Sequence, residues 1–100
     1  MTFHYNTLEI RDRISKGEDI RLVKTNSVHV SIDDRVFESV DGFKAVEGFA
    51  SSIINGKTEA YPIWVMSCGP DFLVQPGFGI DVLLAAKRCQ VEEIYVKVLL

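Results

Sequence analysis

The chain has 100 residues, of which 47% are hydrophobic and 25% charged, so it can bury one modest core and is too apolar to remain disordered. Fourteen acidic residues against eleven basic ones give a formal net charge of −3, opposite in sign to that of a nonspecific nucleic-acid binder. We therefore expect a single domain over residues 1–100 and no nucleic acid among its partners.

The first third of the chain predicts a helix followed by short strands. The helix is expected over Thr7–Lys16, with Asn6 as its cap. Strands are expected at Ile20–Lys24 and Val28–Ile32, and the turn-like residues between them predict a hairpin. A third short strand is expected at Arg35–Ser39.

A second helix is expected from Phe43 to the Asn55-Gly56 pair. Gly48 lies inside it, which suggests that the helix approaches the sheet closely there. The apolar residues at helical spacing predict one buried face, made of Val46, Phe49, Ala50, Ile53 and Ile54.

The rest of the chain predicts two strands, a helix and a last strand, at Tyr61–Ser67, Asp71–Gln75, Ile80–Arg88 and Glu92–Leu100. The resulting order is αβββαββαβ. It predicts an α+β domain in which helices pack on a mixed β-sheet.

The N-terminus shows no secretory signal, and no apolar run reaches the roughly 18 residues that cross a bilayer. Cys68 and Cys89 are the only cysteines. We expect both to be reduced, Cys68 in a turn and Cys89 near a helix end, in a cytoplasmic protein.

No motif in the sequence predicts a cofactor or a metal. Gly77-Phe78-Gly79 begins like a dinucleotide fingerprint, but Val82 stands where its third glycine belongs, so we interpret it as a strand-to-helix turn. The two histidines and two cysteines, at positions 4, 29, 68 and 89, have no metal-ligand spacing.

One segment is strongly acidic. Positions 33 to 47 contain five acidic residues and two basic ones. Their net charge of −3 equals the formal charge of the whole chain. These acids can stabilise the start of the following helix, or they can steer a basic protein partner into contact. The predicted partner-binding residues are Asp33, Asp34, Glu38, Asp41 and Glu47.

In its size, its acidic stretch and the compact run from Tyr61 to Val74, the chain resembles the small cytoplasmic immunity proteins of bacterial contact-dependent inhibition and related polymorphic toxin systems. The resemblance implies a non-enzymatic inhibitor that binds and neutralises one cognate toxin domain, often a basic nuclease. These proteins share no common motif, so it transfers no functional residue.

Two alternatives come from other classes of protein. The first is a small enzyme that uses Cys68 as a nucleophile, with His29 or His4 as its base. The second is an accessory subunit or homodimer that associates through an exposed edge of the final strand, Glu92–Leu100.

Overall fold

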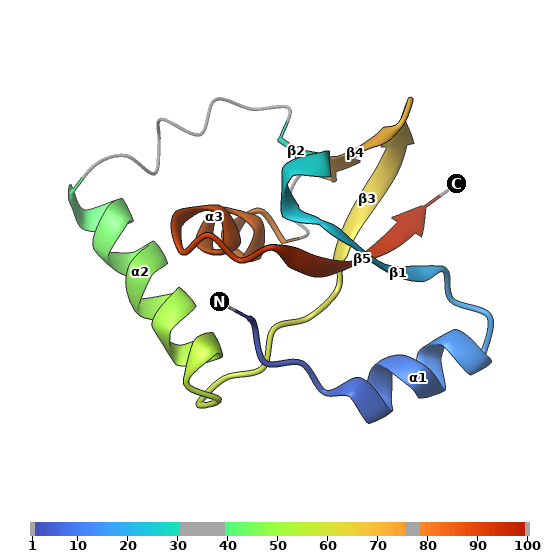
Figure 1. The fold of residues 1–100 in the computed structure, drawn as a ribbon, viewed down its shortest axis with the longest axis horizontal. Helices are drawn as coiled ribbons and strands as arrows, with labels where there is room; N and C mark the ends of the chain where they lie inside the picture. Colours follow the sequence, from blue (N-terminus) through green and yellow to red (C-terminus); the bar gives the residue numbers. More distant parts are fainter. Residues whose placement is uncertain (1, 31–39, 76–78, 100) are drawn as a thin grey trace.

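The computed structural model describes residues 2–30, 40–75 and 79–99, and the side chains of the second helix from Val46 onward. Figure 1 shows its elements, which follow in chain order as α1 (Thr7–Ser15), β1 (Ile20–Lys24), the 3₁₀ turn η1 (Thr25–Ser27), β2 (Val28–His29), α2 (Val40–Ile54), β3 (Ile63–Cys68), β4 (Asp71–Val74), α3 (Ile80–Arg88) and β5 (Glu93–Leu99). The strand expected at Arg35–Ser39 lies outside the described residues.

The five strands of the described residues form one sheet in the order β1-β5-β3-β4-β2. The β1–β5 and β3–β4 pairs are antiparallel, whereas the β5–β3 and β4–β2 pairs are parallel. The predicted α+β fold with a mixed sheet is therefore confirmed. Strands β1 and β2 share this sheet with β3, β4 and β5.

Helices α2 and α3 pack against each other and against one face of the sheet. The predicted face of α2 is confirmed, since Val46, Ala50 and Ile53 are buried in the main core. Every residue of α3 from Val82 to Ala86 is buried, so the helix is covered on more than one face. Strands β3 and β5 contribute Ile63, Val65, Ile94 and Val96 to the same core.

The hairpin predicted between the first two strands is wrong, because β1 and β2 form opposite edges of the sheet. The residues between them form η1, and its first residue is held by the segment before β5. Thr25 is only 3% exposed, its Oγ1 donates to the Val91 carbonyl at 2.6 Å, and its N–H donates to the Glu92 carbonyl at 2.9 Å. These contacts direct the chain away from β1 instead of back along it.

The short link also shows that the sheet is strongly bent. Four residues from Lys24 to Val28 reach at most about 14 Å, whereas the two edges of a flat five-stranded sheet lie about 19 Å apart. Because β1 and β2 are those edges, the sheet brings its two sides towards each other at this end.

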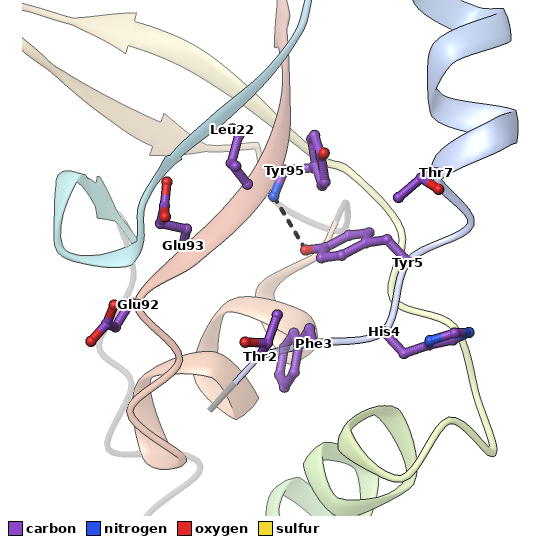
Figure 2. A pocket seen from close by; sticks show the side chains of 9 residues that line it. All are labelled: Thr2, Phe3, His4, Tyr5, Thr7, Leu22, Glu92, Glu93 and Tyr95. Atoms are coloured by element: carbon purple, nitrogen blue, oxygen red, sulfur yellow. Dashed lines mark hydrogen bonds between the residues drawn. The ribbon is translucent and has the colours of Figure 1, made fainter.

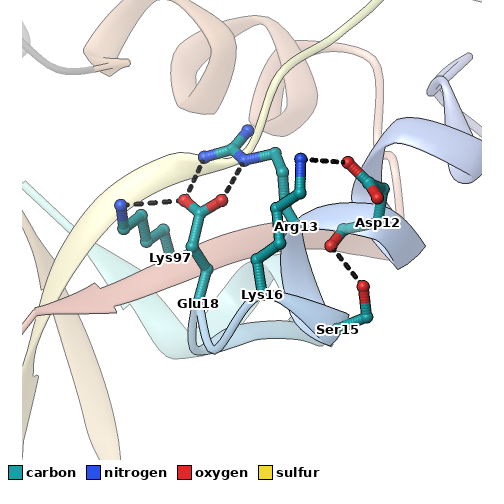
Figure 3. A network of polar contacts seen from close by, with 6 residues as sticks. All are labelled: Asp12, Arg13, Ser15, Lys16, Glu18 and Lys97. Atoms are coloured by element: carbon teal, nitrogen blue, oxygen red, sulfur yellow. Dashed lines mark hydrogen bonds and ion pairs between the residues drawn. The ribbon is translucent and has the colours of Figure 1, made fainter.

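Helix α1 stands apart from the other two helices, beside β1 (Figure 1). As predicted, Asn6 caps it, accepting a hydrogen bond from the Glu9 N–H at 3.1 Å. Arg13 of this helix makes two hydrogen bonds to Glu18, each 2.9 Å long, and Glu18 also pairs with Lys97 of β5 at 2.9 Å (Figure 3). One carboxylate thus joins α1 to a central strand.

Strand β5 lies inside the sheet, between β1 and β3. It pairs with β1 from Glu93 to Lys97 and with β3 from Val96 to Leu99. The exposed edge that the accessory-subunit alternative requires is therefore not present at this strand.

Candidate functional site

The structure places little of the acidic segment predicted to bind a partner. Asp33, Asp34 and Glu38 lie outside the described residues, and for Asp41 only the helical backbone of α2 is described. Glu47 is exposed on α2. The described residues therefore bring none of the five predicted carboxylates together.

The strand register instead brings together a thiol, a carboxylate and an imidazole. Cys68 ends β3, and its partner across the β3–β4 pair is Asp71, the first residue of β4. His29 ends β2 and pairs with Leu73 of β4, two residues beyond Asp71 on the same side of the sheet. Side chains alternate between the two faces of a sheet along each strand. Val28 and Phe72, which precede His29 and follow Asp71, lie on the core side, so the three side chains lie on the opposite face.

The contact described within this group is a hydrogen bond between His29 and Asp71. His29 Nε2 lies 2.9 Å from Asp71 Oδ2, and the two side chains are 50% and 44% exposed. Cys68 is an exposed free thiol. It is the last residue of β3 and not part of the turn in which the sequence placed it. Asp71 therefore stands between the thiol and the imidazole and holds the imidazole in place. We refer to Cys68, Asp71 and His29 as the thiol cluster.

The other histidine does not belong to this cluster. His4 lies in the N-terminal segment, where its carbonyl accepts a hydrogen bond from the Ala60 N–H at 2.8 Å. The second thiol lies elsewhere too, since Cys89 is the C-cap of α3, as predicted, and packs against the main core. Of the two histidines predicted as candidate bases for Cys68, His29 is the one that lies on the same face of the sheet as Cys68.

The N-terminus of α3 already carries a carboxylate. Asp81 Oδ1 accepts hydrogen bonds from the Val82 N–H at 2.9 Å and from the Tyr61 hydroxyl at 3.0 Å. Burial, together with the hydrogen bond to Asp81, raises the pKa of Tyr61 to about 12, so this hydroxyl remains a donor. A phosphate at this helix end would meet a negative charge. Gly77 and Phe78, from the segment interpreted as a turn, lie outside the described residues.

A cavity of about 540 Å³ lies towards the β1 edge of the sheet, at the start of β5. Figure 2 shows its two walls: Leu22, Glu93 and Tyr95 on the strands, and Thr2 to Tyr5 on the N-terminal segment. The rings of Tyr5 and Tyr95 meet edge to face at 4.9 Å. Tyr5 Oη accepts the Tyr95 N–H at 3.2 Å, and burial raises the pKa of Tyr5 to about 12.

Within the described ranges, no group of three or more His, Cys, Asp or Glu side chains is arranged to hold a metal ion. The helices of these same ranges include none with the length and apolar character needed to cross a lipid bilayer.

The fold and the thiol cluster define an α+β domain with an exposed nucleophilic side chain. No protein-family model and no curated protein matches the sequence. Among solved structures, the fold resembles sulfiredoxin from Arabidopsis thaliana, with a TM-score of 0.58 and 16% sequence identity over 80% of this chain and 83% of that chain. At this identity, the likeness establishes the fold.

The immunity-type inhibitor predicted from the sequence is therefore wrong as the main interpretation. The likeness in fold to sulfiredoxin agrees better with the alternative of a small enzyme than with an immunity protein. The sequence did name Cys68 and His29 as candidates. It missed Asp71, whose contact with His29 joins residues 42 positions apart.

Proposed function

We propose that this chain is a small enzyme of thiol chemistry, with Cys68 as its nucleophile, His29 as the proton acceptor and Asp71 as the group that orients His29. One observation carries the proposal: the register of β2, β4 and β3 gathers these three side chains on one exposed face, with His29 and Asp71 in contact. Asp71 holds Nε2 of the His29 ring, which fixes the tautomer and leaves Nδ1 as the nitrogen that takes the proton.

The reaction that suits this site is thiol–disulfide exchange with an exposed disulfide of another molecule. Exchange needs an accessible thiolate and a proton acceptor, but no enclosed pocket. Cys68 Sγ gives its proton to His29 and attacks one substrate sulfur. A Cys68–substrate bond forms, the substrate disulfide breaks, and the leaving sulfur departs as a thiolate that takes up a proton.

A second thiol must complete the cycle. Cys89 is too far away for this role, since it packs on the core side of α3. A small cellular thiol therefore attacks the mixed disulfide, bonds to the substrate sulfur and releases Cys68. This chemistry requires a reducing compartment, so a cytoplasmic location forms part of the proposal.

The proton reaches His29 through water. Asp71 lies between the thiol and the imidazole, and all three side chains are open to solvent. The proton therefore passes through solvent and not through a direct contact between Cys68 and His29.

The test is the rate at which the purified protein reduces a chromogenic aromatic disulfide in the presence of reduced glutathione. We expect Cys68→Ser to abolish turnover and Cys89→Ser, the matched control, to retain it. We expect His29→Gln to lower the rate constant at neutral pH by about tenfold or more, because removing a general base costs at least that much. Asp71→Asn should reduce it by a smaller factor.

The pH profile separates a catalytic role for His29 from a structural one. A catalytic role predicts that the pH–rate profile of His29→Gln differs in shape from that of the native chain, whereas a structural role lowers the rate by the same factor at every pH. Turnover that is unchanged in Cys68→Ser, or no faster than that of free cysteine, would contradict the proposal.

A further inference from the structure

The cavity at the start of β5 combines aromatic walls with negative charge, and the thiol cluster does not use it. Its volume of about 540 Å³ lies within the range of sites that hold small organic molecules. Tyr5 of the N-terminal wall meets Tyr95 of the strand wall edge to face, Leu22 adds an aliphatic surface beside Tyr95, and Phe3 lies on the N-terminal wall (Figure 2). A ligand body that fits here is apolar.

Two carboxylates set the charge of the cavity. Glu92 and Glu93 are adjacent at the start of β5, and both line the cavity while remaining exposed to solvent. Neither takes part in a salt bridge of the described residues. Lys24 is the register partner of Glu93 on β1, yet no ion pair joins the two side chains. The two negative charges are thus available to a ligand.

The phenol of Tyr5 adds no charge to the cavity. Burial keeps the pKa of Tyr5 near 12, so its phenol stays neutral at physiological pH. His4 also lines the cavity, and in Figure 2 its ring points away from Tyr5 and Tyr95. Aromatic faces beside carboxylates attract a cation through both the ring quadrupole and direct charge.

This combination excludes several classes of ligand. Phosphates and carboxylates would be repelled by Glu92 and Glu93. A bare metal ion would find carboxylates on one wall but apolar and aromatic groups on most of the rest. We infer that the cavity binds a small organic amine, with its ammonium at Glu92 and Glu93 and its apolar body against Tyr5, Tyr95 and Leu22.

The experiment compares three probes that share one aromatic body and differ in charge: phenethylamine, phenethyl alcohol and hydrocinnamate. Backbone amide shifts of the native protein are followed by NMR during each titration. We expect saturable shifts at Leu22, Tyr95 and Tyr5 with phenethylamine, in the millimolar range that suits so small a ligand. The alcohol should bind about tenfold more weakly, and the carboxylate should not saturate.

Variants then assign the charge. Glu92→Gln combined with Glu93→Gln should weaken phenethylamine binding about tenfold and leave the alcohol unaffected, because the substitutions change charge and preserve shape. Glu47→Gln removes an exposed acid on α2 and serves as the matched control. Equal affinities for amine and alcohol, shifts confined to other residues, or unchanged binding in the double variant would each overturn the inference.

Discussion

At the scale of single residues, two glycines differ in whether the structure requires glycine: Gly79 just before α3 and Gly48 within α2. Gly79 precedes α3 with φ +111°, and a Cβ there would lie 2.2 Å from Ile63 Cγ2. Gly48 is exposed on α2, and a Cβ added to it would have no neighbouring heavy atom within 4 Å, so the close helix–sheet approach expected from the sequence is wrong. Position 79 therefore requires glycine, both for its backbone conformation and for the lack of space beside Ile63. Position 48 requires it for neither reason.

The two alanine variants should change stability in opposite directions. We expect Gly79→Ala to cost about 2–4 kcal/mol, because it combines a left-handed backbone with an overlap in the core. Gly48→Ala should stabilise the protein by about 0.5–1 kcal/mol through its better helix propensity. Urea unfolding followed by circular dichroism measures both. A Gly79→Ala variant as stable as the native chain would contradict the geometry at Ile63.

At the scale of elements, Glu18 connects α1 to the sheet. The two hydrogen bonds from Arg13 and the contact with Lys97 lower the pKa of Glu18 from 4.5 to about 2. Lys97 also lies 5.1 Å from the centre of the Trp64 ring, on the face of the sheet away from the main core. One ionised carboxylate therefore links α1 to β5.

This arrangement predicts acid sensitivity with a defined sign. A carboxylate whose pKa is lower in the folded state stabilises the protein above its unfolded pKa, and this contribution is lost as the pH falls from about 4.5 towards 2. The melting temperature of the native chain should fall more steeply over this interval than that of Glu18→Gln. Asp12→Asn is the matched control, since it removes only the exposed pair with Lys16. Parallel curves for the native chain and Glu18→Gln would rule out this role.

At the scale of the whole molecule, local patterns predicted the elements but not the path between them. The Asn6 cap, the apolar face of α2 and the strands β3 and β4 depend on residues close together in sequence, and all of these were predicted. The placement of β1 and β2 depends on the bond from Thr25 to Val91, 66 positions away. The sequence named only part of the thiol cluster for the same reason. The strand order, which local patterns do not give, decides which side chains lie beside Cys68.

The strand order also predicts that the two sites work independently. The amine cavity lies at β1 and the start of β5, whereas Cys68 lies at the end of β3 beside β4, towards the opposite edge of the sheet. Distant sites with no shared contact usually add independently. In a Cys89→Ser background, alkylating Cys68 with iodoacetamide should therefore leave the affinity for phenethylamine within about twofold. Because coupling between binding sites is reciprocal, a larger change would mean that amine binding also alters the Cys68 site.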